Sequence, residues 1–197
     1  HSCNTYFIAL SEYLDKEQFI ETAKKLGFGE ELVLCDDIVS ASGNLQTKND
    51  INVPAELANM SFGQGKLTAT PVQICRMTSA IANNGVIKYP TLIKGIKYND
   101  GTIEYNKTNL GMNVLSAYMR NVVIADNSMS APNETTAAGK TSTAQTGWVD
   151  ENGNEMYNCW FTGFFPSYNP EYAVTILIEG GVSGNRDAGP VFKAIAD

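Results

Sequence analysis

Histidine is almost missing from this sequence, because the only one is His1. A Ser-His-Asp or Cys-His catalytic unit needs an imidazole beside its nucleophile, and here the first residue would have to supply it. The sequence therefore argues against both of these units.

Metal-ligand patterns and basic clusters are also lacking. The cysteines Cys3, Cys35, Cys75 and Cys159 form no C-x-x-C pair and no zinc-ligand spacing. The 14 Lys and Arg residues are outnumbered by 21 Asp and Glu, and no basic stripe is present to neutralise phosphates. The sequence thus predicts no metal, no cofactor and no nucleic-acid partner.

Long apolar runs are absent as well, since none reaches the roughly 18 residues that a membrane span needs. We therefore expect no direct membrane contact within these residues. The content of 43% hydrophobic and 18% charged residues is typical of a soluble globular protein. A chain of 197 residues is long enough for one domain with a sizeable core.

Helix signals dominate the first 130 residues. Asp15 as N-cap and Gln18 three residues later predict a helix that ends at Gly27. The pair Thr70-Pro71 predicts the start of a mostly buried core helix. A β-hairpin is expected near 91–106, followed by a helix around Val114 to Ala125.

Strand signals dominate the last third. The runs "AAGKTSTAQ", "NCWFTGFF" and "YAVTILIEG" predict three strands, and Pro190 suits the first turn of a C-terminal helix. The fold class is therefore α+β. We expect one domain over 1–197, with a mainly helical lobe over 1–130 packed on the antiparallel sheet and final helix of 131–197.

Lys140 is the first residue that points to chemistry. A lysine in a strand often only protects a sheet edge from aggregation, and this structural role is one reading. The other reading rests on the small residues around it, Ala137 to Gly139 and Ala144, because they let the backbone of a ligand lie alongside the strand. A carboxylate-bearing peptide would suit the ammonium and the neighbouring hydroxyls.

A second motif, Ser2-Cys3-Asn4, gains meaning beside "KTS" at Lys140, because S-x-N and K-T-G occur together in penicillin-binding proteins. The stretches "HSCNTYFIAL", "SFGQGKLTATPVQICRMTSAIANNGV", "AAGKTSTAQTG", "CWFTGFFP" and "YAVTILIEGG…AGPVFKAI" resemble the transpeptidase domain of class B penicillin-binding proteins. The resemblance follows that family's order over nearly the whole chain. It implies a penicillin-binding-protein or serine β-lactamase-like fold, incomplete here, with about three of five sheet strands.

The resemblance also implies roles for individual residues. Ser2 would relay a proton, and Asn4 would hydrogen-bond the amide of the substrate. Lys140 would polarise Ser2 and attract the terminal carboxylate. The hydroxyls of Thr141 and Thr143 would help hold that carboxylate, and the Thr143 N–H would form half of the oxyanion hole. Ser142 stands where glycine is usual, which we expect to be tolerated with some effect on ligand fit.

The family's nucleophile motif, S-x-x-K, is not found, because none of the 12 serines has a lysine three residues on. We therefore expect a part of a longer transpeptidase that is inactive alone. The intact protein would cross-link D-Ala-D-Ala stem peptides through a serine acyl-enzyme and bind β-lactams. It would be anchored, by a segment outside this chain, at the extracytoplasmic face of the bacterial membrane.

Other functions remain open at this point. One is a non-catalytic sensor of β-lactams or peptidoglycan, including a natural truncated paralogue that only binds. Another is a relative of the serine β-lactamases or D,D-carboxypeptidases, which share the motifs. We also expect the strand from Tyr172 to Gly180 to form an exposed apolar sheet edge, through which the chain could self-associate.

Overall fold

The computed structural model describes residues 3–93, 95–105, 110–111, 119, 122–124 and 128–197. Its helices are α1 (Asn4–Ser11), α2 (Lys16–Lys25), α3 (Pro54–Ser61), α4 (Pro71–Ala82) and α6 (Gly189–Ala196), with a 3-10 turn η1 (Asp50–Asn52) and a π-helical turn η2 (Gly184–Ala188). Its strands are β1 (Val33–Cys35), β2 (Ile38–Val39), β3 (Val86–Ile87), β4 (Gly95–Lys97), β5 (Ile103–Tyr105), β6 (Leu110–Gly111), β7 (Ala138–Val149), β8 (Glu155–Phe165) and β9 (Tyr172–Gly181).

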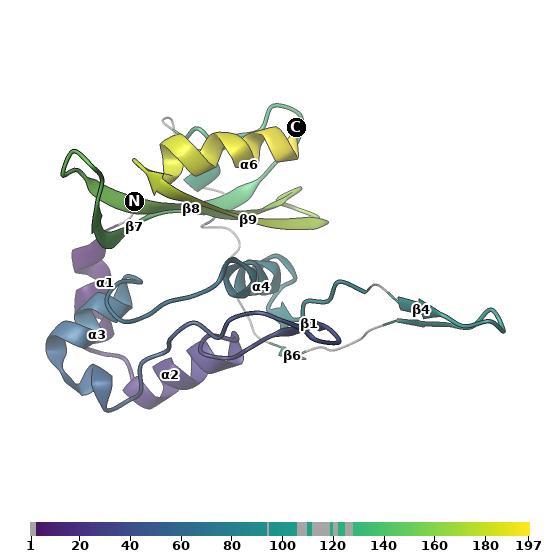
Figure 1. The fold of residues 1–197 in the computed structure, drawn as a ribbon, viewed down its shortest axis with the longest axis horizontal. Helices are drawn as coiled ribbons and strands as arrows, with labels where there is room; N and C mark the ends of the chain where they lie inside the picture. Colours follow the sequence, from purple (N-terminus) through teal and green to yellow (C-terminus); the bar gives the residue numbers. More distant parts are fainter. Residues whose placement is uncertain (1–2, 94, 106–109, 112–118, 120–121, 125–127) are drawn as a thin grey trace.

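The three long strands form one sheet, with α6 above it and the other helices below (Figure 1). Helix α4 lies directly beneath this sheet, and the predicted hairpin β4–β5 projects away from the rest of the molecule. The α+β prediction is confirmed in this arrangement of helices and an antiparallel sheet. The helix expected around 114–125 lies largely outside the described residues.

The sheet has the order β7-β8-β9, and both pairings are antiparallel. Its two faces are distinguished by their neighbours. On one face the ring of Phe161 packs on Phe192 of α6, with centroids 4.4 Å apart. On the other face the Thr162 hydroxyl lies 2.7 Å from the hydroxyl of Thr78 on α4 and 2.6 Å from that of Thr175. Both faces of the sheet are therefore covered.

Two buried clusters stabilise the two parts of the molecule. The cluster under α6 combines residues of β8, η2 and α6 with two residues that precede β7. Its members are Val123, Ala137, Phe161, Phe165, Ala188 and Phe192. The cluster between α2, η1 and α3 is smaller and contains Ile20, Ile51, Leu57 and Met60. Burial of each large apolar side chain contributes about 1.5–3 kcal/mol, so the α6 cluster is a main source of stability around β7 and β8.

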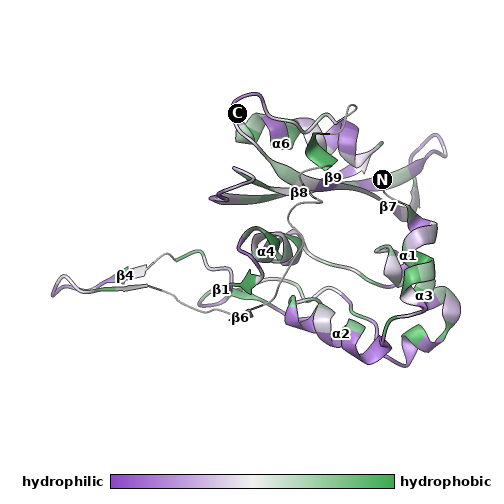
Figure 2. Ribbon diagram, turned by 180° about the vertical axis from the view of Figure 1, so that it is seen from behind, coloured by the Kyte–Doolittle hydropathy of each residue, from purple (hydrophilic) through white to green (hydrophobic). Residues whose placement is uncertain are grey.

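Helix α2 begins and ends where the sequence predicts. The Asp15 carboxylate accepts a hydrogen bond of 2.9 Å from the backbone N–H of Gln18. The helix stops before Gly27, whose φ of +95° suits a residue without a side chain. Figure 2 shows that α2 is mostly hydrophilic, whereas α4 is mostly hydrophobic. This difference agrees with the exposed position of α2 and the central position of α4.

Helix α4 follows its predicted N-cap, Thr70, but its burial differs from the expected pattern. Its larger apolar side chains Val72, Cys75, Met77 and Ile81 are only half-buried, whereas Ala80 is buried as expected of a core helix. The buried positions instead include polar side chains, namely Gln73, Arg76 and Thr78. Gln73 and Thr78 hydrogen-bond to other parts of the chain. The central position of the helix therefore depends on polar contacts as well as on apolar packing.

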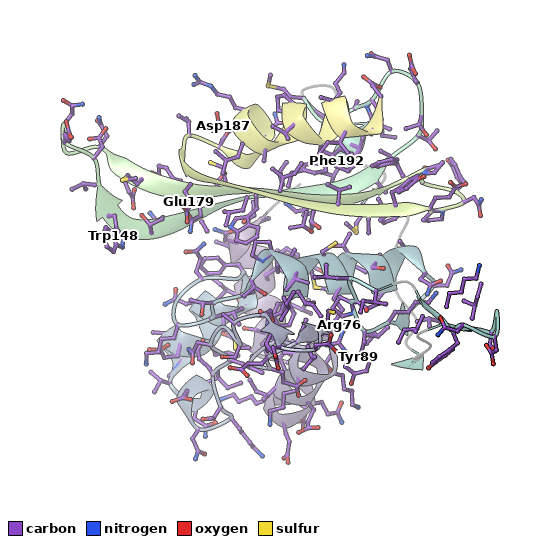
Figure 3. The ribbon with its side chains drawn as sticks, turned by 45° about the vertical axis from the view of Figure 1, so that its right-hand side comes forward. Arg76, Tyr89, Trp148, Glu179, Asp187 and Phe192 are labelled. Carbon is purple, nitrogen blue, oxygen red and sulfur yellow. The ribbon has the colours of Figure 1, made fainter. Side chains whose placement is uncertain are left out.

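Arg76 is the most unusual of these buried groups. Only 5% of it is exposed, and its guanidinium carbon lies 4.6 Å from the centre of the Tyr89 ring, a cation–π contact (Figure 3). Its Nε and Nη1 atoms have no hydrogen-bond partner among the described residues. The same guanidinium fills the space beside Gly27, where a side chain would stand.

Candidate active site

The predicted lysine motif lies near the start of β7, which is an edge strand of the sheet. Among the described strands, β7 pairs only with β8, so its other edge is open. In this register Lys140 stands opposite Thr162, and Thr143 stands opposite Cys159. Because alternate residues of a strand face opposite ways, Lys140 and Ser142 lie on the α4 side of the sheet, and Thr141 and Thr143 on the α6 side.

Lys140 is a half-buried cation without an opposite charge beside it. Its Nζ donates a hydrogen bond of 2.6 Å to the carbonyl oxygen of Thr141. No ion pair to Lys140 is found within the described part of the chain. Burial lowers the pKa of Lys140, because the surroundings disfavour the charged form. An anion bound at this position would therefore relieve an unbalanced charge.

The hydroxyl residues that follow Lys140 are positioned differently. Thr141 is half-buried, whereas Ser142 and Thr143 are exposed. The Thr143 Oγ1 accepts a hydrogen bond of 3.0 Å from the backbone N–H of Gly184, in the segment between β9 and α6. The strand thus presents one ammonium and several hydroxyls along a short length of open edge.

Gly184 explains how a serine fits at position 142. A Cβ at Gly184 would stand 2.4 Å from the carbonyl oxygens of both Ser142 and Trp160, so only glycine allows the segment to lie this close. It covers the Ser142 backbone from the α6 side. The Ser142 side chain lies on the opposite side and is exposed, so it does not collide with this segment.

The S-x-N motif is only partly described. Ser2 lies outside the described residues, so its relation to Lys140 stays a prediction. Asn4 is the exposed first residue of α1, and its side chain makes no hydrogen bond to the described residues. Figures 1 and 3 both show α1 below the sheet, on the side of α4, and Figure 1 shows it near β7. The structure thus brings Lys140 and the three hydroxyl residues together, and places Asn4 on the side of the sheet that Lys140 faces.

Two residues near this site were not singled out from the sequence. Gly184 and Asp187 lie in the glycine-rich stretch "GGVSGNRDAG", which reads only as a connection between a strand and a helix. The dense glycines were the available signal, because a glycine can mark a close approach of two backbones. The sequence could not predict which backbone comes close to these glycines, because Thr143 is 41 residues away from Gly184.

Two other kinds of feature are not found in the described residues. No group of three or more His, Cys, Asp and Glu side chains is arranged to hold a metal ion. In the same residues, no helix is both long and apolar enough to cross a membrane.

Comparisons with known proteins agree with the motifs. The family model described as "Penicillin binding protein transpeptidase domain" matches residues 1–197. The peptidoglycan D,D-transpeptidase MrdA of Haemophilus influenzae is 26% identical over all of this chain and 34% of the relative. MrdA of Acinetobacter baumannii is 27% identical over 95% of this chain and 32% of the relative. The chain therefore spans about a third of the length of these curated relatives.

Solved structures show the same likeness. PBP2 of Pseudomonas aeruginosa in complex with WCK 5153 has a TM-score of 0.77 and 27% identity, covering 98% of this chain and 46% of that one. PBP3 of Mycobacterium tuberculosis complexed with aztreonam has a TM-score of 0.78 and 25% identity, covering 98% and 48%. The fold and the family that the motifs predicted are both confirmed. The chain belongs to the penicillin-binding protein transpeptidase domain family.

Proposed function

We propose that these residues form the lysine side of the active site of a serine-type peptidoglycan D,D-transpeptidase. One observation carries the proposal: Lys140 is half-buried, has no opposite charge among the described residues, and lies on an open strand edge beside exposed hydroxyls. An extended acyl donor with a terminal carboxylate would supply the missing negative charge. The named relatives, which are D,D-transpeptidases, support this choice of reaction.

The donor would be a D-Ala-D-Ala stem peptide, or a β-lactam in its place. Such a ligand can pair with the open edge of β7 by main-chain hydrogen bonds, as an added strand does. Its carboxylate would lie at the open edge of β7, held by the ammonium of Lys140 from the α4 side and by the hydroxyls of Thr141 and Thr143 from the α6 side. The Thr143 N–H would donate to the oxyanion that forms when the acyl carbon is attacked. The neighbour solved with aztreonam, which is a β-lactam, supports β-lactam binding.

Ser2 and Asn4 would complete this side of the site. In the proposed mechanism Ser2 passes a proton toward the leaving group, and Lys140 keeps the Ser2 hydroxyl polarised. Asn4 donates to, or accepts from, the amide of the bound peptide. Because no S-x-x-K occurs in these 197 residues, we propose that the acylating serine is supplied by sequence outside them. We also propose that the whole protein is membrane-anchored and works at the extracytoplasmic face.

The test is covalent labelling by fluorescent benzylpenicillin, with the full-length protein that carries these residues and with the 197-residue chain. The full-length protein should label and the 197-residue chain should not. Lys140→Ala should slow labelling by about 100-fold, because a charge-assisted bond contributes roughly 1.5–3 kcal/mol. Lys97→Ala, which removes an exposed lysine on the projecting hairpin, is the matched control and should label at the parental rate.

Each other outcome argues for another function. Labelling of the 197-residue chain would show that it contains its own nucleophile. Labelling of the full-length protein without turnover of a D-Ala-D-Ala peptide would favour the sensor. Rapid release of hydrolysed penicillin would favour the β-lactamase relative. Parental labelling of Lys140→Ala would overturn the role of this lysine.

A further inference from the structure

The segment from Val182 to Ala188 is closed on itself by one carboxylate. The Asp187 Oδ2 accepts hydrogen bonds from the backbone N–H groups of Val182 at 2.6 Å and Ser183 at 2.9 Å. The Asp187 N–H in turn donates to the carbonyl of Ser183 at 2.9 Å. Figure 3 shows Asp187 above the sheet, on the side of α6. These bonds lower the pKa of Asp187, so the carboxylate stays charged at neutral pH.

Asp187 is also held against the sheet. A Cβ at Gly181 would stand 2.7 Å from the Sγ of Cys159 and 2.8 Å from the Oδ2 of Asp187, so both atoms flank the backbone of Gly181. Cys159 is fully buried on β8 and is the register partner of Thr143. The carboxylate that closes the segment is therefore fixed one strand away from Thr143.

Gly184, the residue after Ser183, connects this segment to Thr143. Its N–H donates to the Thr143 Oγ1 at 3.0 Å, and its Cα packs where no side chain could stand. A hydroxyl has one proton to donate and lone pairs that accept. Because Gly184 occupies the accepting side of Thr143, and no acceptor for the Thr143 proton is found among the described residues, this proton is available to an acceptor on a ligand.

We propose that Asp187 is a positioning residue for carboxylate recognition: it holds the Gly184 N–H against Thr143 and so orients the Thr143 hydroxyl as a donor to the carboxylate of the acyl donor. This inference rests on the proposed function, since it assigns a partner to a residue of the same site. It adds a residue 44 positions beyond the threonine that touches the ligand.

The test compares acylation of the full-length protein by benzylpenicillin and by its methyl ester, which keeps the β-lactam ring but lacks the carboxylate charge. Asp187→Ala should lower the acylation efficiency for benzylpenicillin by about tenfold, the value of one hydrogen bond to a charged group, and leave the ester nearly unchanged. Asp187→Asn retains an accepting oxygen and should keep most of the preference for the acid.

Two controls separate positioning from general damage. Asp150 likewise accepts bonds of 2.8 Å from two backbone N–H groups, those of Asn152 and Asn154, but at the tip of the β7–β8 hairpin. Asp150→Ala should leave the preference for acid over ester unchanged. The double variant Asp187→Ala/Thr143→Val should be no worse than Thr143→Val alone, because both changes remove the same hydrogen bond.

Hydrogen exchange gives a readout that does not depend on activity. Asp187→Ala should speed the exchange of the amide protons of Val182, Ser183 and Gly184, and Thr143→Val should speed that of Gly184 alone. Unchanged exchange at Gly184 in Asp187→Ala would overturn the proposal, as would equal loss of acylation by the acid and the ester. Failure of the unsubstituted full-length protein to label would instead overturn the proposed function.

Discussion

Gly27 shows at the scale of single residues how a backbone conformation and a buried cation depend on each other. Its φ is +95°, and a Cβ there would stand 2.1 Å from the Nη1 of Arg76. That guanidinium has little room to move, because Arg76 is only 5% exposed and lies over the ring of Tyr89. The end of α2 and the middle of α4 therefore meet at a position that only glycine fits.

Replacing this glycine should separate two kinds of cost. We expect Gly27→Ala to lower the free energy of unfolding by about 3 kcal/mol, of which about 1–2 kcal/mol is left-handed strain and the rest is the collision with Arg76. Gly153→Ala is the matched control, since Gly153 has a φ of +80° but no atom within 4 Å of its Cβ position. It should cost only the strain. Urea denaturation of both variants measures the difference, and equal losses would show that Arg76 yields freely.

At the scale of elements, the start of α4 was predictable and its burial was not. Thr70 and Pro71 are local signals, and they placed the first turn correctly. The side chain of Gln73, however, donates to the carbonyls of Gly27 at 2.9 Å, Glu30 at 3.0 Å and Ser42 at 2.8 Å. These partners lie 31 to 46 residues away along the chain, and no sequence pattern predicts them. A polar residue at a buried helical position could not be told from an exposed one.

Gln73 should therefore matter far more than its residue type suggests. Gln73→Leu leaves three carbonyls without their donor, and we expect it to lower the free energy of unfolding by about 3 kcal/mol. Gln18→Leu is the matched control, because Gln18 also occupies the third position of a capped helix but is exposed. It should change stability by less than about 0.5 kcal/mol. Similar losses in the two variants, measured by chemical denaturation, would contradict the assigned role of Gln73.

The candidate site divides in the same way between local and distant information. The strand around Lys140, the small residues beside it and the hydroxyl residues after it could all be predicted from this stretch of sequence alone. The support for Thr143 was not, because Gly184 and Asp187 reach it only after β8 and β9 have been added and the chain has returned over the sheet. A motif names the residues that touch a ligand, whereas the residues that hold them are set by topology.

At the scale of the whole molecule, the sheet joins the two parts and leaves two open edges. The cluster under α6 covers one face, and the hydroxyls of Thr78, Thr162 and Thr175 connect the other face to α4. Among the described strands, β7 and β9 each have one unpaired side. The edge of β7 carries the candidate site. β9 contributes none of the candidate-site residues, and Glu179 is the only charged residue in this strand.

An unpaired edge with so little charge is a template for another strand, and two copies of β9 can pair antiparallel with each other. We therefore expect the 197-residue chain to self-associate, with a mass by light scattering that rises from 21.4 kDa toward twice that value as concentration increases. Over the same range, the amide protons of β9 that are not bonded to β8 should become protected from exchange, while those of the projecting β4–β5 hairpin should not. A constant monomeric mass, together with rapid exchange at the outer amides of β9, would show that this edge stays open, because pairing would slow their exchange.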